Sequence, residues 1–285
     1  MSIDVVMLTK DSNKPWFRRV LMAIKREIPV HHFILVDGYS TDGTVDVVKE
    51  LFGSKVIVLR TRESLGGARY LGMKAVDTEW FAYIDSDVEI LPGWFSAAER
   101  YMKQPYIYGI QGVFVSSINK EGRVEWKPSF VLLPGEKKSI VGAILRYGVN
   151  RLYGADSAHV LIRRNVINFI DPCFLIQLDR AEDTYIAWKI IEKGYFYLRI
   201  SAMKAIHYGS YSLSKAMKRA LGRNGLYYRI PYSVFVINNI FRFLAHIWKK
   251  DKATLVYLNE LILSLPSYLK VESILKTCQE NTRYI

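Results

Sequence analysis

Three carboxylates follow closely on an apolar run in the first third of the chain. The run from Trp80 to Ile84 predicts a buried strand, and Asp85, Asp87 and Glu89 come directly after it. Side chains two positions apart in an extended segment point the same way, so these carboxylates would share one side if the chain stayed extended. Such hard oxygen ligands suit Mg²⁺ or Mn²⁺, which commonly bridge carboxylates to substrate phosphates. Taken alone, the stretch fits a metal and phosphate site or an ordinary solvated turn.

The elements that would position these carboxylates alternate between strands and helices over the first 90 residues. Apolar runs predict strands, and turn-rich or helix-start signals precede the segments with helical patterns. The strands are expected at 3–8, 33–36, 55–59 and 80–84, and the helices at about 15–27, 44–52 and 65–76. This alternation predicts a largely parallel sheet covered by helices, with ligands at the carboxyl ends of the strands.

The rest of the chain is less regular. Helices are expected at 92–102 and 181–192, and strands or extended pieces at 107–117, 124–133 and 196–200. After His207 the chain becomes basic and aromatic, as in residues 213–228, and residues 253–269 are amphipathic. Such a segment could lie on a membrane surface or form an ordinary helical layer on the sheet.

Composition narrows the class of protein. The chain has 285 residues, half of them apolar, which fits a folded protein and argues against disorder. From Ser201 onward there are thirteen Lys or Arg and four Asp or Glu, a net charge of +9 out of +13 for the whole chain. A basic C-terminal part implies an anionic partner such as a lipid surface, nucleic acid or a phosphate-bearing substrate.

Compartment signals are few. No basic segment followed by a long apolar one opens the chain, so no signal peptide is expected. The longest uncharged stretch, residues 230–241, is too short to span a bilayer as a helix. Cys173 and Cys278 lie far apart without metal-ligand spacing, which indicates a reducing compartment and no redox role.

Five short motifs occur in a fixed order along the chain, and the ordered set identifies a protein family more specifically than any single motif does. They are Val6-Met-Leu-Thr-Lys10, Ile34-Leu-Val-Asp-Gly-Tyr-Ser-Thr-Asp-Gly-Thr44, Gly66-Gly-Ala-Arg-Tyr-Leu-Gly72, Tyr83-Ile-Asp-Ser-Asp87 and Ala181-Glu-Asp-Thr-Tyr185. With these motifs the chain resembles family 2 glycosyltransferases, which have the GT-A fold, over roughly residues 3–210.

The resemblance implies an α/β fold of the GT-A, Rossmann-like type, with a mixed, mostly parallel sheet flanked by helices. We expect this domain over residues 1–210 and a basic, aromatic helical region over residues 211–285. The implied activity is that of an inverting glycosyltransferase, hexosyltransferase-like, which moves a sugar from a nucleoside-diphosphate sugar to an acceptor hydroxyl. The acceptor is expected to be a glycan or a lipid-linked molecule.

The resemblance also assigns residues to the nucleotide sugar. Asp37 would accept hydrogen bonds from the N–H groups of the base, with Thr9 beside it, whereas an acid there could otherwise serve as a helix N-cap. Arg69 would reach the base or the phosphates through charge-assisted hydrogen bonds, and its alternative is a surface helix position. Gly66 and Gly67 allow close backbone approach.

The metal ligands implied by the resemblance come from the opening stretch and one histidine. Asp85 would face the ribose or the metal, and Asp87 would hold Mn²⁺ or Mg²⁺ against the diphosphate. His207 and Glu89 are additional candidate ligands, although a histidine after a strand is often structural. The metal would neutralise charge on the leaving nucleoside diphosphate.

The catalytic base implied by the resemblance is Asp183, which would take the proton of the acceptor hydroxyl. Its neighbour Glu182 could orient the acceptor or act as the base in place of Asp183. The alternative is two surface acids in the first turn of a helix, where they suit the helix dipole.

Three other functions fit the sequence less well. A nucleotidyltransferase should carry a glycine-rich phosphate loop after the first strand, and residues 9–15 contain no glycine. A non-catalytic basic protein that binds nucleic acid or membrane would leave the carboxylate motifs unexplained. No strand is followed by G-x-G-x-x-G, which argues against a dinucleotide-dependent oxidoreductase. The preferred hypothesis is a cytoplasmic glycosyltransferase, peripheral on an anionic membrane face, and nucleic acid is not an expected partner.

Overall fold

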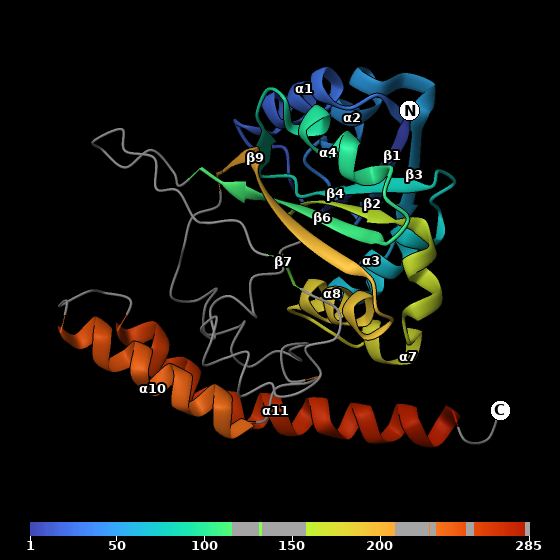
Figure 1. The fold of residues 1–285 in the computed structure, drawn as a ribbon. Coiled ribbons are helices and arrows are strands. Elements are labelled where there is room, and N and C mark those ends of the chain that lie inside the picture. The colour runs from blue at the N-terminus through green and yellow to red at the C-terminus, as the bar shows by residue number, and fades with distance from the viewer. Residues whose placement is uncertain (116–130, 133–157, 209–227, 229–231, 249–253, 283–285) are drawn as a thin grey trace.

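The computed structural model describes residues 1–115, 131–132, 158–208, 228, 232–248 and 254–282. Within these ranges the chain forms a mixed α/β structure built on one sheet of nine strands (Figure 1). The sheet order is β3-β2-β1-β4-β8-β6-β9-β5, with β7 paired to β9. The predicted α/β class with helices on both faces of the sheet is confirmed.

The first half of the sheet is parallel, as the alternation of elements predicts. It consists of β1 (Ile3–Thr9), β2 (Val30–Asp37), β3 (Val56–Arg60) and β4 (Trp80–Ile84), which pair in parallel. The connections are α1 (Phe17–Glu27), α2 (Thr44–Phe52), the 3-10 turn η1 (Gly53–Lys55) and α3 (Leu65–Lys74). Because these strands run the same way, their carboxyl ends meet at one edge.

The second half of the sheet is mixed. It contains β5 (Val88–Ile90), β6 (Ile107–Phe114), β7 (Val131–Leu132), β8 (His159–Arg163) and β9 (Phe196–His207). Between these strands lie α4 (Trp94–Met102), η2 (Arg164–Phe169), α7 (Pro172–Leu175) and α8 (Glu182–Glu192). Strand β9 is longer than the expected 196–200 and pairs with β6, β5 and β7, so it carries His207 to the edge where β4 ends.

Two apolar cores lie on opposite faces of the sheet. Helices α1, α2 and α4 cover one face, and α3, α7 and α8 cover the other (Figure 1). Trp80 and Trp94 are fully buried in the first core, and Phe174 and Tyr185 are fully buried in the second. Successive side chains along β4 and its neighbouring strands point to opposite faces of the sheet and fill both cores. The strand ends that carry polar residues are therefore held rigidly.

Two helices follow the sheet, α10 (Tyr232–Trp248) and α11 (Thr254–Thr282). They pack on each other, and the second half of α11 buries Val271, Ile274 and Cys278 in the core around α7 and α8. Among the described helices, none is long and apolar enough to cross a membrane. The basic segment 213–227 and the expected strand residues 124–130 lie outside the described ranges.

The two cysteines contradict their sequence-based interpretation. Cys173 in α7 and Cys278 in α11 form a disulfide, with a Cα–Cα separation of 5.8 Å. Disulfides persist mainly in oxidising compartments, so this pairing removes the argument for a reducing compartment that the spacing of the cysteines supplied. The sequence could not show it, because the pair depends on the docking of α11 beside α7.

Candidate functional site

A polar cluster lies at the carboxyl ends of β1 and β2. Thr9 and Asp37 are direct partners in the parallel register, and the Thr9 hydroxyl donates to Asp37 Oδ1 at 3.1 Å. Asp37 is fully buried and also accepts a hydrogen bond from the Ser40 backbone N–H at 2.9 Å. The Ser40 hydroxyl in turn accepts the backbone N–H of Asp11 at 2.8 Å. The structure therefore brings the predicted pair Thr9 and Asp37 together and fixes the loops after both strands.

The carboxylates after β4 lie on a turn. The backbone N–H of Val88 donates to the Asp85 carbonyl at 3.1 Å, and Asp85 N–H donates to the Ala158 carbonyl at 2.9 Å. The expectation of three carboxylates along one side of an extended segment is therefore wrong. The chain reverses direction after Asp85 because β5 must pair with β9 and not continue β4. Ser86 Oγ contacts Ser12 Oγ at 3.0 Å, which joins this turn to the loop after β1.

Arg69 connects this turn to α8. Its side chain is only 4% exposed, and its Nε donates to Glu182 Oε1 at 2.6 Å while a terminal nitrogen lies 3.3 Å from Asp85 Oδ1. Burial alone would lower the pKa of the Arg69 guanidinium, but the charges of Glu182 and Asp85 raise it overall. The guanidinium also lies over the Tyr83 ring, 4.9 Å from its centroid. Arg69 is thus a buried cation shared by two carboxylates, and not the surface helix residue that was the alternative.

Asp183 lies beside this ion pair, at the start of α8. Glu182 is buried against Arg69, while the side chain of Asp183 is partly exposed and accepts the Thr184 backbone N–H at 2.6 Å. Ala181, just before the helix, adopts a left-handed conformation with φ 52°. The two adjacent acids therefore have different surroundings, and only Glu182 is neutralised by Arg69.

Asp87 and His207 form a close pair across the β5 and β9 ends. His207 Nε2 lies 3.3 Å from Asp87 Oδ2, and both side chains are partly exposed. Two ligand atoms each about 2.1 Å from one ion are separated by about 3.0–3.5 Å, so this donor set fits a divalent metal. The separation also fits a direct contact between a carboxylate and an imidazole.

The Glu89 carboxylate forms hydrogen bonds with residues other than Asp87 and His207. Its carboxylate accepts from Arg19 Nε at 2.9 Å and from the Tyr208 hydroxyl. The Tyr208 backbone N–H donates to the Asp87 carbonyl at 2.8 Å. Glu89 therefore holds the residue after His207, because β5 directs positions 88 and 90 into the core and position 89 to the opposite side.

Three non-glycine residues with positive φ all lie in the loops of this region. Among the described residues, these are Asp11 (48°), Tyr39 (61°) and Ala181 (52°). Such conformations cost of order 1 kcal/mol or more and persist where surrounding contacts fix them. Here they follow β1, follow β2 and precede Glu182, so backbone strain is concentrated at the edge where the polar clusters meet.

Sequence reasoning missed several residues that build the site. Tyr83 supports Arg69, and its hydroxyl donates to the Arg69 carbonyl at 2.7 Å, while burial raises the pKa of that hydroxyl. Ser40, Ser12 and Tyr208 were also missed. Only Tyr83 had a usable signal, since a tyrosine inside a buried strand needs a hydrogen-bond partner.

The glycines before Arg69 serve packing against protein. A Cβ on Gly66 would lie 2.0 Å from the Leu175 carbonyl oxygen, and the Gly66 N–H donates to the Leu178 carbonyl at 2.9 Å. Gly66 therefore allows α3 to approach α7 and the segment after it closely, and an approach of this backbone to a nucleotide sugar stays a prediction.

Two further polar side chains, both on β8, have structural partners. His159 is buried and accepts from Trp94 Nε1 at 3.1 Å, and burial lowers its pKa to about 3, helped by the charges of Arg199 and His207. Arg163 donates to the Ile107 carbonyl at 3.2 Å and also contacts Glu79. Since Arg163 pairs with Trp80 at the amino end of β4, it lies at the edge opposite the candidate site.

The family model described as glycosyl transferase family 2 matches residues 4–171. No curated protein sequence matches the chain.

Solved structures match the fold at low sequence identity. S. aureus TarS matches with a TM-score of 0.53 and 16% identity, over 77% of this chain and 38% of the TarS chain. GalNAc-T7 with UDP, GalNAc and Mn²⁺ matches with a TM-score of 0.51 and 17% identity, over 72% of this chain and 43% of that chain. The mannosyltransferase PcManGT from Pyrobaculum calidifontis, in complex with GDP-Man and Mn²⁺, matches with a TM-score of 0.55 and 13% identity, over 98% and 76% of the two chains. These likenesses show a GT-A fold, and the chain spans less than half the length of TarS and GalNAc-T7.

Proposed function

The chain belongs to glycosyl transferase family 2, and we propose that it transfers a sugar from a nucleoside-diphosphate donor to an acceptor hydroxyl with inversion at the anomeric carbon. Support for the donor class comes from the fold neighbours crystallised with UDP, GalNAc and Mn²⁺ and with GDP-Man and Mn²⁺.

One observation carries the proposal. The Arg69 guanidinium binds Asp85 after β4 and Glu182 at the start of α8, although these carboxylates are far apart in the sequence. This contact brings the carboxylates proposed for the diphosphate and metal to the helix end that carries Asp183. A donor and an acceptor group could therefore be held at one site.

The nucleotide end is proposed to lie at Asp37. An ionised carboxylate has about four acceptor positions. In the described part of the chain, Asp37 accepts three hydrogen bonds, all from Thr9 and Ser40. The remaining capacity suits one N–H group of a base, and the bonds from Thr9 and Ser40 hold the carboxylate in a single orientation.

Asp87 and His207, with Asp85 nearby, are the proposed ligands for a divalent ion. A carboxylate oxygen and an imidazole nitrogen 3.3 Å apart fit Mn²⁺ better than Mg²⁺, because imidazole is a poor ligand for Mg²⁺. Such an ion, when bound, neutralises charge on the leaving diphosphate. Glu89, predicted as a further ligand, is proposed instead to position Tyr208 and thereby the end of β9.

Asp183 is the proposed general base. The acceptor oxygen forms the new bond to the anomeric carbon as the bond from that carbon to the diphosphate oxygen breaks, and the acceptor proton passes to the Asp183 carboxylate. Glu182 is less suited to this role because its charge is balanced by Arg69. We propose that Glu182 positions α8, while partly exposed Asp183 meets the acceptor.

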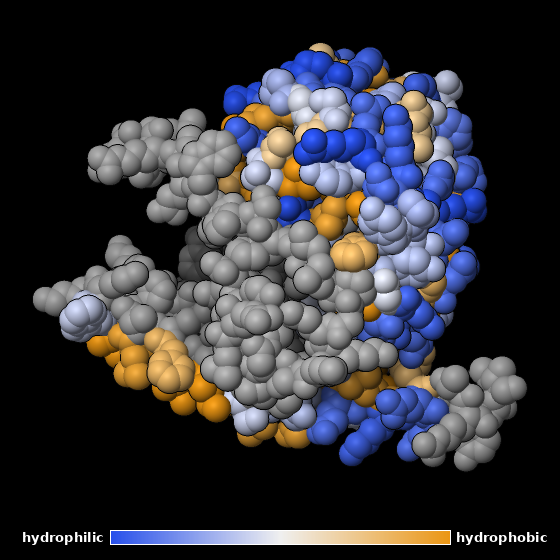
Figure 2. All heavy atoms as spheres, in the orientation of Figure 1, coloured by the Kyte–Doolittle hydropathy of each residue, from blue (hydrophilic) through white to orange (hydrophobic). Residues whose placement is uncertain are grey.

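The C-terminal helices are proposed to contact an anionic membrane leaflet. Exposed apolar side chains recur on one face of α10 and on one face of α11 at helical spacing. This α10–α11 apolar surface comprises Ile237, Ile240, Phe241, Leu244, Ile247 and Trp248 of α10, and Leu258, Ile262, Leu265 and Leu269 of α11. Figure 2 shows apolar side chains gathered over α10.

The surrounding sequence is basic, with a net charge of +9 from residue 201 onward, which favours anionic lipid. A lipid-linked acceptor would then be delivered to a site on residues 1–210 by a helical region over residues 211–285. The cytoplasmic face stays a prediction from the sequence.

Two experiments test these proposals. Asp183→Asn should retain donor binding in the presence of Mn²⁺, measured by calorimetry with a panel of nucleotide sugars, and should lose transfer. Full transfer by this variant would disprove the base assignment, and the anomeric configuration of the wild-type product, read by NMR, tests inversion.

For the membrane, Phe241→Asp with Leu244→Asp should abolish co-sedimentation with anionic vesicles at low salt. Met22→Asp, a change at an exposed position of α1, is the matched control.

A further inference from the structure

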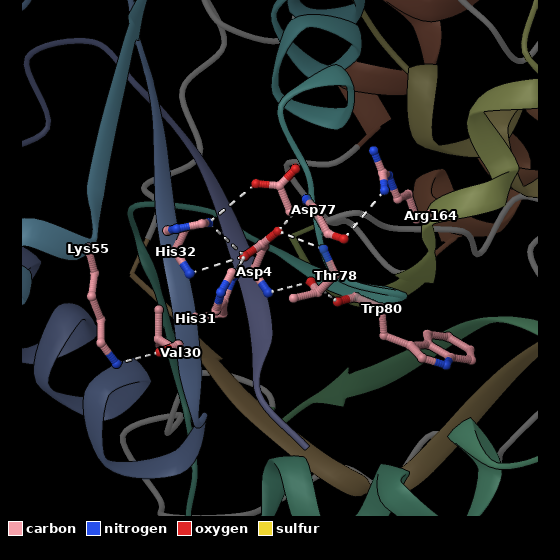
Figure 3. A network of polar contacts seen from close by, with 9 residues as sticks. All are labelled: Asp4, Val30, His31, His32, Lys55, Asp77, Thr78, Trp80 and Arg164. Carbon is pink, nitrogen blue, oxygen red and sulfur yellow. Dashed lines mark hydrogen bonds and ion pairs between the residues drawn. The ribbon is translucent and has the colours of Figure 1, made fainter.

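A second cluster of ligand side chains lies at the opposite edge of the sheet, where the parallel strands begin. The register of β1 and β2 shifts there, with Ile3 opposite Val30 and Val5 opposite Phe33. One residue, Asp4, therefore faces two, His31 and His32, as in a β-bulge. Successive residues of a regular strand point to opposite faces, but the bulge allows both imidazoles to approach Asp4 (Figure 3).

The donor atoms of this cluster are close together. His31 Nδ1 lies 3.0 Å and His32 Nδ1 lies 3.5 Å from Asp4 Oδ1. His32 Nδ1 is also 3.7 Å from Asp77 Oδ2, which comes from the connection between α3 and β4. Among the described residues, Asp4, His31 and His32 form the one set of three ligating side chains whose ligand atoms all lie within 4.8 Å of one another.

These separations match a tetrahedral ion. With metal–ligand bonds of about 2.0–2.2 Å, the edges of a tetrahedron of ligand atoms are about 3.3–3.6 Å long. The three observed separations of 3.0, 3.5 and 3.7 Å bracket that range. Two imidazoles and two carboxylates are also a donor set suited to zinc and unlike the all-oxygen sets preferred by Mg²⁺ or Ca²⁺.

The surroundings orient the central carboxylate. Asp4 Oδ2 accepts the backbone N–H groups of Asp77 at 2.7 Å and Thr78 at 3.1 Å, and Oδ1 accepts that of His32 at 3.0 Å. Asp4 is fully buried, so backbone amides fix its Oδ1 toward the histidines. Hydrogen bonds that orient a ligand in this way are typical of protein metal sites.

A further observation singles out His32. Its Nδ1 is buried and has no hydrogen-bond partner among the described residues, although it lies between the Asp4 and Asp77 carboxylates. A buried nitrogen without a partner is costly, because it has lost its hydrogen bond to water. An ion bound to Nδ1 would remove that cost.

We propose that Asp4, His31, His32 and Asp77 bind a zinc-class divalent cation at the amino-end edge of the sheet. The ion would join β1, β2 and the chain segment entering β4, far along the strands from Asp37, which ends β2, and Asp85, which follows β4. The site is independent of the proposed transfer reaction, and we assign it a stabilising role.

The test uses the full chain without a polyhistidine tag, freed of metal by a chelator. Zinc affinity and stoichiometry are measured by competition with a chromophoric chelator, and Co²⁺ absorption in the visible range reports tetrahedral coordination. Two double variants are compared. One carries His31→Ala and His32→Ala, and its matched control carries Asp87→Ala and His207→Ala. Asp4 is left unchanged because it also holds three backbone amides.

The expected result is one equivalent of tightly bound zinc and a raised thermal midpoint in the wild type and in the Asp87 and His207 variant. In the His31 and His32 variant the affinity should fall by more than about 100-fold and the rise in thermal midpoint should disappear. Equal zinc affinity in both variants, or no tight zinc binding by the wild type, would overturn the proposal. Asp77→Ala, at an exposed side chain, should weaken binding without unfolding the chain.

Discussion

The buried contact between Arg69 and Glu182 makes the sharpest prediction. Replacing Arg69 by Met removes the cation and leaves a carboxylate that is only 3% exposed without its partner. Breaking a buried ion pair in this way costs about 3–5 kcal/mol, which for a chain of this size corresponds to a fall in the unfolding midpoint of roughly 6–20 °C. Asp85 contributes less to this cost, because its side chain is 35% exposed and water can solvate it.

The double variant separates stability from function. Arg69→Met combined with Glu182→Leu removes both charges, and buried pairs replaced by apolar residues of similar volume are often neutral in stability. We therefore expect the double variant to recover most of the lost stability and to remain inactive in sugar transfer, since Asp85 and Asp183 have lost their common anchor. Stability is measured by urea and thermal unfolding followed by circular dichroism, and transfer by release of nucleoside diphosphate.

The control is the exposed ion pair of Arg18 and Glu50, whose side chains are both 56% exposed. Arg18→Met should leave both stability and transfer unchanged, because solvent screens such pairs. Two results would refute the reasoning. One is a loss below about 1 kcal/mol for Arg69→Met, and the other is a double variant as unstable as the sum of its single changes.

Three further predictions concern single residues. Asp87→Ala should weaken Mn²⁺-dependent donor binding at least about 10-fold in calorimetry and leave metal-free binding unchanged, and an equal loss without metal would contradict a ligand role. Gly66→Ala should destabilise the chain by about 1–3 kcal/mol in urea unfolding, because the new methyl would lie 2.0 Å from the Leu175 carbonyl oxygen. His159→Gln should make the free energy of unfolding fall less steeply as the pH is lowered. Burial lowers the pKa of His159 to about 3, so its stabilisation is complete above the unfolded pKa near 6.5 and is lost as pH falls toward 3. An unchanged slope between pH 6.5 and 3 would show that another group controls acid unfolding.

The parallel half of the fold could be predicted because local signals and tertiary packing agree there. Apolar runs of strand length alternate with helix-start signals, and each predicted strand from β1 to β4 is present. Strand β9 was predicted too short, since polar Ser201 and Lys204 interrupt its apolar pattern, while pairing with β6 and β5 extends it to His207. Period-two patterns weaken where a strand changes neighbours along its length.

The candidate site was harder to predict than the fold. Thr9 and Asp37 are brought together because parallel strand ends meet in register, which follows from topology alone. The contact of Arg69 with Glu182 could not be predicted, because a partner 113 positions away in the sequence leaves no local signal. Its expected contact with the nucleotide sugar stays a prediction. Glu89 was expected to share one side with Asp85 and Asp87 if the chain stayed extended, but the turn at Asp85 directs its carboxylate to Arg19 and Tyr208.

The disulfide between Cys173 and Cys278 has a topological consequence. It closes a covalent ring over a sequence separation of 105 residues, and that ring contains Asp183 and His207. A single backbone cut anywhere inside the ring would leave one molecule of unchanged mass on a non-reducing gel, apart from one added water. Reduction would release two fragments, one carrying Asp87 and the other carrying the end of α11. If the cut lies between Cys173 and His207, the proposed partners Asp87 and His207 would then be held together by packing and not by a continuous covalent path.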